Sequence, residues 1–195
     1  AAVLWRWHVN IAVIGSGSWG CAFGRLLVCG GHNVQVLTMT PAEAAELNRT
    51  HENPRFLPDV KLPPEIHFVG MDDADLSGSE LVVYAVPTQA VRTVARWVAP
   101  RRVSGSLQLS LAKGYELGTL KRPSQVIKEE TGGVVAALSG PNHAEEVARD
   151  MPSATVIACG DEEVAAVLQR AITCDTFRVY TNDDIVGVEY CGAVK

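Results

Sequence analysis

The sequence predicts an α/β fold of the Rossmann type, with a doubly wound, largely parallel sheet that further strands extend. Three observations support this prediction. Short apolar runs alternate with segments of helical periodicity along the 195 residues, a pattern typical of parallel sheets with helical crossovers. The run 9–14 leads directly into a glycine-rich turn, and a helical segment follows that turn at once. The hydrophobic content of 47% is sufficient for one well-filled core.

The predicted strands are short and bounded by turn residues, as expected for strands buried on both faces. They cover residues 9–14, 33–38, 66–69, 80–86, 106–111, 134–139, 153–158 and 177–180. The predicted helices cover residues 18–29, 41–50, 88–98, 119–130, 143–149, 161–172 and 183–194. Thr40 before Pro41, and Asp161 before two glutamates, are typical helix starts. Residues 53–64 contain four prolines and no periodicity, so we expect an ordered loop there in which Phe56 and Leu57 are packed.

Composition excludes several classes of function. The net charge is −5 and the 17 lysines and arginines are scattered, so nucleic acid is not expected as a partner. Five cysteines without a C-x-x-C pair suggest neither a disulfide framework nor a zinc site, and no metal is expected. No apolar run approaches the roughly 18 residues of a membrane span. Reduced cysteines favour a cytoplasmic location, or a plastid if the N-terminus is a processed transit segment.

The most informative motif is G-x-G-x-x-G at residues 15–20. In the dinucleotide-binding form of this motif, Gly15 allows the tight turn, Gly17 lets the backbone approach a pyrophosphate, and Gly20 lets the helix lie close to the strand. The N-terminus of the following helix offers unpaired N–H groups and a positive dipole end to phosphates. The alternative is a glycine-rich turn without a ligand.

The end of the second predicted strand bears on the choice of cofactor. NAD-binding turns are usually followed, roughly 20 residues on, by an Asp or Glu that binds the ribose. Here the segment 37–41 contains neither a carboxylate nor an arginine, and only Thr38 and Thr40 could hydrogen-bond a ribose hydroxyl or a 2′-phosphate. We expect NAD or NADP, with a slight preference for NADP because no acid repels the extra phosphate.

Two lysines are candidates for chemistry. Lys113 follows the carboxyl end of a predicted strand, where ligands of open α/β sheets gather; it could hold a phosphate or a developing oxyanion, or be a solvated loop lysine. Lys195 shares a helix face with Cys191 and Gly192. Because glycines are costly inside a helix, Gly187 and Gly192 indicate a close approach. A desolvated lysine there would have a lowered pKa suited to proton transfer; the alternative is a solvated C-terminal lysine.

Residues 139–146 predict another strand-to-helix turn. Asn142 is a candidate helix cap, with Glu145 at the capping-box position. The turn is either only a well-capped helix start or a backbone cradle that faces a cofactor. His143 is a candidate general acid or, alternatively, a packing residue.

Several motifs together resemble one family. They are residues 15–20, Asn53-Pro-Arg-Phe-Leu-Pro58, Ala85-Val-Pro-Thr-Gln89, Lys113-Gly114, 138–147 and 179–195. In this order and spacing, from about residue 9 to the end, the chain resembles the NAD(P)-dependent sn-glycerol-3-phosphate dehydrogenases, most closely the bacterial and plastid type. The resemblance implies hydride transfer between NAD(P) and the pair sn-glycerol 3-phosphate and dihydroxyacetone phosphate, in phospholipid biosynthesis and carbohydrate metabolism.

The resemblance also implies roles for individual residues. The cofactor would contact Gly15, Gly17, Ser18, Trp19, Gly20, Thr38, Lys113 and Ala144, and the substrate Lys113, Gly140, Asn142 and Lys195. Lys195 would be catalytic, as the acceptor of the C2 hydroxyl proton, together with Lys113. The chain departs from the family at Asn142, where Ser or Thr is usual, at His143, where Phe is usual, and at 38–40, where Arg or His is usual in NADP-using members.

Family members continue with a helical domain of comparable size that is absent from this chain. We therefore expect residues 1–182 to form the NAD(P)-binding Rossmann-like domain and 183–195 to begin the helix that leads into a helical substrate domain. We expect a homodimer when full length, and poor turnover from the 195 residues alone. Two alternatives stay open: a non-catalytic dinucleotide-binding module, and a 3-hydroxy acid dehydrogenase of the same wider group.

Overall fold

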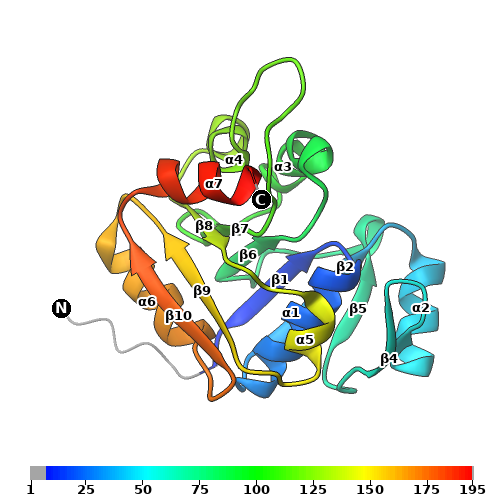
Figure 1. Ribbon diagram of the computed structural model, residues 1–195. Coiled ribbons are helices and arrows are strands. Elements are labelled where there is room, and N and C mark those ends of the chain that lie inside the picture. Colours follow the sequence, from blue (N-terminus) through cyan, green and yellow to red (C-terminus); the bar gives the residue numbers. More distant parts are fainter. Residues whose placement is uncertain (1–7, 195) are drawn as a thin grey trace.

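The computed structural model describes residues 8–194, and they form an eight-stranded sheet covered by helices (Figure 1). The strands of this sheet are β1 (Asn10–Ile14), β2 (Asn33–Thr38), β5 (His67–Gly70), β6 (Leu81–Tyr84), β7 (Leu107–Ser110), β8 (Val135–Ser139), β9 (Ser153–Ala158) and β10 (Phe177–Asn182). The helices are α1 (Ser18–Cys29), α2 (Pro41–Thr50), α3 (Val91–Val98), α4 (Pro123–Thr131), α5 (Ala144–Ala148), α6 (Glu162–Ile172) and α7 (Ile185–Ala193). The predicted α/β fold is confirmed.

The strand order is β10-β9-β8-β7-β6-β1-β2-β5. All neighbouring strands are parallel except β8 and β9, which are antiparallel. The chain builds outward from β1 through β2 to β5, and then returns to the other side of β1 with β6. The strand order therefore reverses between β1 and β6, the point at which open α/β sheets bind ligands.

The core has two halves, one on each face of the sheet. Alternate residues of β1 point to opposite faces, so that Ile11 and Val13 join the half covered by α1, α5 and α6, while Ala12 and Ile14 join the half covered by α3 and α4. All four of these side chains are buried. The central strands β1 and β6 thus carry no polar face, which is the pattern that predicted a parallel sheet.

The segment 53–64 differs from the prediction of a loop. It contributes Asn53 and the following residues to a two-stranded hairpin of β3 (Glu52–Asn53) and β4 (Leu57–Lys61), which lies beside α2. Leu57 is buried in the core, as predicted. The prediction for Phe56 is wrong: its ring is 40% exposed and lies under the Arg55 guanidinium, 4.8 Å from it. The turn between the two strands points this side chain outward.

Helix α4 begins later than predicted. Residues 119–122 belong to the loop after β7, and Pro123 occupies the first helical position, where its fixed φ favours a helix start. Apart from this helix, the predicted strands and helices are present with ends that shift by at most three residues. No helix within residues 8–194 is long and apolar enough to cross a membrane.

Candidate functional site

The glycine turn lies where the strand order reverses, between the carboxyl ends of β1, β2 and β6. Gly15 has a φ of 110°, which glycine adopts far more readily than other residues, and its N–H donates to the Leu37 carbonyl at 3.0 Å. A Cβ at Gly15 would lie 2.6 Å from the carbonyl oxygen of Ala85. A Cβ at Gly20 would overlap the carbonyl oxygen of Gly15. Backbone packed against backbone therefore closes the turn.

Gly17 differs from the other two glycines because it faces open space. A Cβ added there would meet no atom within 4 Å. Gly17 is the N-cap of α1, no side chain in the described part of the chain caps this end, and the first turn holds no acidic residue. Ser18 and Trp19 lie half-buried at the start of the helix. The N–H groups and the positive end of the helix dipole are thus available to an anion.

Polar side chains from other parts of the chain hydrogen-bond to Ser16, inside the glycine turn. Asn53, which is 5% exposed, donates from Nδ2 to the carbonyl oxygen of Ser16 at 2.8 Å. The hydroxyl of Ser16 donates to Glu43 Oε1 at 2.5 Å. Cys21 donates to the same Ser16 carbonyl, and burial raises the pKa of its thiol to about 11. The supporting roles of Asn53 and Glu43 were not predicted, since they act across 37 and 27 positions of sequence.

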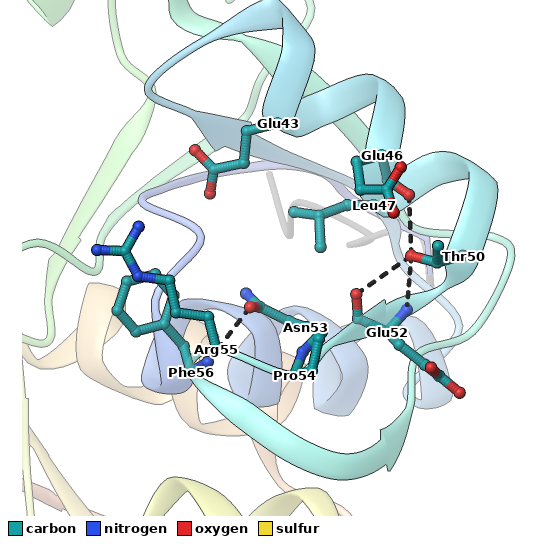
Figure 2. A pocket seen from close by; sticks show the side chains of 9 residues that line it. All are labelled: Glu43, Glu46, Leu47, Thr50, Glu52, Asn53, Pro54, Arg55 and Phe56. Carbon is teal, nitrogen blue, oxygen red and sulfur yellow. Dashed lines mark hydrogen bonds between the residues drawn. The ribbon is translucent and has the colours of Figure 1, made fainter.

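A pocket of about 260 Å³ borders this support (Figure 2). It lies between α2 and the β3–β4 hairpin and is lined by Glu43, Glu46, Leu47, Thr50, Glu52, Asn53, Pro54, Arg55 and Phe56. Figure 2 shows Glu43 on one side of the hollow, with Arg55 and Phe56 on the other. Asn53 and Glu43 connect the pocket to the glycine turn through Ser16.

Thr38, at the end of β2, is too enclosed for the predicted contact with a ribose. Thr38 is 0% exposed, and its hydroxyl donates to the Thr40 carbonyl at 2.8 Å. A ribose could reach this hydroxyl only after the surrounding backbone moved. The Thr40 side chain accepts from the N–H of Glu43 at 3.2 Å and so caps α2, as predicted.

Lys113 reaches from the end of β7 to the turn after β8. Its Nζ donates to the carbonyl oxygen of Gly140 at 2.9 Å. Its own carbonyl accepts from Thr88 Oγ1 at 2.6 Å. The backbone after it is held by Gln89, which donates to the Tyr115 carbonyl and accepts from the Leu117 N–H, both at 2.9 Å. Lys113 is therefore part of a bonded arrangement, rather than a loop lysine surrounded only by solvent.

The turn after β8 is close-packed around Gly140. A Cβ there would lie 2.7 Å from Asn142 Oδ1 and 2.9 Å from Thr155 Oγ1. The prediction that Asn142 caps the next helix is wrong: its Nδ2 donates to the Ala154 carbonyl at 2.9 Å, because β9 returns antiparallel beside this turn. The N-cap of α5 is His143, without a side-chain bond to the helix.

Ala144 starts helix α5, next to this turn. The side chain of His143 is exposed, which contradicts a packing role. Arg25 of α1 forms a bidentate ion pair with Asp150, two residues after the end of α5, with both N–O distances at 2.7 Å. Residues of α1 and α5 also share one apolar core cluster, so the helix after the glycine turn packs beside the helix that begins at Ala144.

Helix α7 lies against the turn after β8, at the upper edge of the sheet in Figure 1. A Cβ at Gly192 would lie 2.5 Å from Ser139 Oγ and 3.9 Å from Lys113 Cγ, so the predicted close approach at Gly192 is confirmed. Gly187 leaves room for Asp184, whose carboxylate accepts the Gly187 N–H at 2.8 Å. Lys195 lies outside the described residues.

These features define a class of protein. The sheet is largely parallel, with a glycine turn at its switch point, an uncapped helix N-terminus beside open space, and a lysine on the segment after β7. Together these features form a dinucleotide-binding domain of the Rossmann type. Among residues 8–194, no group of three or more His, Cys, Asp or Glu side chains could hold a metal ion.

The comparison with known proteins specifies the family. The family described as NAD-dependent glycerol-3-phosphate dehydrogenase N-terminus matches residues 10–165, and the chain belongs to this family. The glycerol-3-phosphate dehydrogenase (NAD(P)+) of Moorella thermoacetica is 46% identical over 186 residues, which are 95% of this chain and 56% of the relative. A second such enzyme, from Mycobacterium tuberculosis, is 44% identical over 190 residues, or 95% of this chain and 57% of the relative.

Solved structures agree with this assignment. The glycerol-3-phosphate dehydrogenase of Coxiella burnetii superposes with a TM-score of 0.88 at 28% identity, covering 96% of this chain and 57% of that chain. The enzyme GPD1 of Saccharomyces cerevisiae gives a TM-score of 0.81 at 26% identity, covering 95% of this chain and 60% of that one. The chain thus spans a little over half the length of the relatives that it matches.

Proposed function

We propose that this chain binds NAD or NADP and supplies the cofactor-binding half of an enzyme that interconverts sn-glycerol 3-phosphate and dihydroxyacetone phosphate. The observation that carries the proposal is Gly17, which faces open space at the uncapped N-terminus of α1. A pyrophosphate at this position would accept backbone N–H groups and meet the positive end of the helix dipole. Family membership supports the choice of substrate pair.

The dinucleotide would lie across the carboxyl edge of the sheet. Gly15, Gly17 and Gly20 form the turn, and Ser18 and Trp19 would flank the pyrophosphate. Thr38 and the pocket between α2 and the β3–β4 hairpin would border the adenosine side. Lys113 and Ala144 would contact the nicotinamide side, because they lie on the segments that follow β7 and β8, beyond the switch point. We keep the slight preference for NADP, since no carboxylate follows β2 in the segment 37–41.

The substrate would lie beside Lys113, Gly140 and Asn142. A bound nicotinamide supplies the acceptor or donor of the hydride. The Lys113 ammonium would stabilise negative charge on the substrate, at the phosphate or at the developing alkoxide. Lys195 would take the C2 hydroxyl proton of sn-glycerol 3-phosphate and return it in the reverse direction.

Further assignments follow from the family and are part of the proposal. Residues 1–182 would form the NAD(P)-binding domain, and 183–195 would begin the helix that leads into a helical substrate domain of a longer polypeptide. That polypeptide would act as a homodimer in the cytoplasm and would provide sn-glycerol 3-phosphate for phospholipid biosynthesis.

Calorimetric titration of the 195-residue chain with NADPH and with NADH tests the proposal. We expect one site for at least one of the two dinucleotides. A steady-state assay of the 195 residues with dihydroxyacetone phosphate should give poor turnover, because they match only 56% of the length of the Moorella thermoacetica enzyme, and the rest of such an enzyme would help to exclude water. The absence of binding to both dinucleotides would refute the proposed function.

A further inference from the structure

Helix α7 contains one buried charge. Glu189 is 5% exposed, although its neighbours Val186 and Tyr190 are 44% and 52% exposed. Burying a carboxylate is costly unless it is paired and hydrogen-bonded. Helix α7 is otherwise apolar, yet its single carboxylate points inward while apolar side chains remain exposed. The hydrogen bonds of this carboxylate therefore determine the orientation of the helix.

The partners of Glu189 all belong to the start of α4. Its carboxylate accepts from Arg122 at 2.5 Å, from the backbone N–H of Ser124 at 2.9 Å, and from the Ser124 hydroxyl at 2.5 Å. Arg122 is the N-cap of α4, and its side chain is 12% exposed. A negative charge at a helix N-terminus is favourable because it meets unpaired N–H groups and the positive end of the dipole. Glu189 thus caps α4 from another helix.

This bond joins α7 to the loop that begins at Lys113. That loop, residues 113–122, ends at Arg122, and its Tyr115 ring lies 5.4 Å from the Tyr190 ring of α7. Further along α7, Gly192 lies against Ser139 and the stem of Lys113. Rotation or withdrawal of α7 would therefore open the contact that supports Lys113, whose Nζ bonds to Gly140.

We propose that Glu189 is a positioning residue that sets the rotation and depth of α7, and that α7 in turn holds the Lys113–Gly140 contact in the geometry needed by the nicotinamide side of the site. The proposal rests on the proposed function, since it assumes that a dinucleotide reaches Lys113. Glu189 would not touch the dinucleotide itself.

Two ligands separate this role from a purely structural one. ADP carries the pyrophosphate of the glycine turn but has no nicotinamide nucleoside, whereas NADH has both. Loss of positioning at Lys113 should weaken the binding of NADH and leave the binding of ADP unchanged. General destabilisation at a temperature well below unfolding would change neither affinity, or both alike.

The experiment compares dissociation constants of NADH and ADP for the 195-residue chain and its variants by calorimetry. In Glu189→Leu we expect the preference for NADH over ADP to fall by about tenfold, as ångström-scale misplacement of a binding group can do. Glu189→Gln should retain most of the preference for NADH over ADP, because the amide oxygen of the glutamine can still accept hydrogen bonds from Ser124. Ser124→Ala, which keeps the ion pair, should give an intermediate loss and serves if Glu189→Leu does not fold. Leu76→Ala, a buried residue before β6, is the control for stability alone.

The outcomes distinguish the two proposals. If the unmodified chain binds NADH and ADP, but the preference is the same in Glu189→Leu, or in Ser124→Ala where the leucine variant does not fold, the positioning role is overturned. If Leu76→Ala lowers the preference as much, the effect belongs to stability and the positioning role is again overturned. If the unmodified chain binds NADPH and not NADH, NADPH replaces NADH in this comparison. If it binds neither NADPH nor NADH, the proposed function fails first, and this inference fails with it.

Discussion

The glycine turn and the Lys113–Gly140 contact lie along the same edge of the sheet but are built in different ways. The turn consists of backbone packed against backbone: the space beside Gly15 and Gly20 is filled, and only Gly17 is open. The Lys113 contact consists of side chains that reach in from separate elements, with Thr88 and Gln89 holding the backbone around it. The first region tolerates no added atom at Gly15 or Gly20, while the second depends on bonds that can be removed one at a time.

The largest effect is expected at Gly20. Gly20→Ala places a methyl group on the Gly15 carbonyl, so the turn or the start of α1 must shift. We expect a loss of about 3 kcal/mol or more in the free energy of unfolding, at the upper end of overpacking effects. Urea denaturation measures it.

The matched control for Gly20 is Gly78→Ala, whose added Cβ would meet no atom within 4 Å. This variant should unfold within about 0.5 kcal/mol of the unmodified chain, as surface substitutions usually do. Equal stabilities of the two variants would contradict the backbone-to-backbone description of the turn.

A smaller effect is expected for the loop after Lys113. Gln89→Ala removes the acceptor of the Leu117 N–H and the donor to the Tyr115 carbonyl. Hydrogen exchange of the peptide that contains Leu117 should then be faster by roughly fivefold or more, since a net hydrogen bond contributes about 1 kcal/mol.

Gln169→Ala is the control for Gln89. It removes a comparable bond, at 2.8 Å to the Val179 carbonyl, on the other side of the molecule. Exchange at Leu117 should be unchanged in this variant. Unchanged exchange at Leu117 in Gln89→Ala as well would show that the loop is held by other contacts.

The smallest effect concerns the acid stability of the same loop. Hydrogen bonds from Arg92 and then Thr119 lower the pKa of Glu116 from 4.5 to about 2. Because the folded pKa is lowered, this ion pair stabilises the fold above pH 4.5, and the contribution is lost as the pH falls towards 2.

Glu116→Gln should therefore give a shallower fall of the unfolding free energy between these pH values, measured by urea denaturation at several pH values. Glu65→Gln, at an exposed position, should leave the slope unchanged. A slope in Glu116→Gln equal to that of the unmodified chain would remove Glu116 from the acid response.

The same contrast explains what could be predicted from the sequence. The turn at Gly15–Gly20 is local, so spacing and the flanking strand and helix sufficed to predict its geometry. Asn53 and Glu43 support that turn from distant positions, and nothing near them in the sequence indicates Ser16 as their partner. Only the folded arrangement of α2 and the β3–β4 hairpin brings them there.

The errors also arise from contacts distant in sequence. Asn142 has the spacing of a helix cap, but β9 returns antiparallel beside it and offers the Ala154 carbonyl instead. Glu189 was not singled out from the sequence, because its burial depends on the start of α4, more than 60 positions away. Sequence periodicity predicts the elements, whereas their mutual arrangement determines which polar groups meet.

Gly17 tests the central claim most directly, because it is the one glycine of the turn with space for a side chain. Gly17→Ala should fold like the unmodified chain, with the free energy of unfolding lower by no more than about 1 kcal/mol, the usual range for an N-cap change. Its methyl group would occupy the space assigned to the pyrophosphate, so the affinity for NADPH or NADH should fall by about tenfold or more. Undiminished dinucleotide affinity in a folded Gly17→Ala chain would contradict the claim that the pyrophosphate lies at this turn.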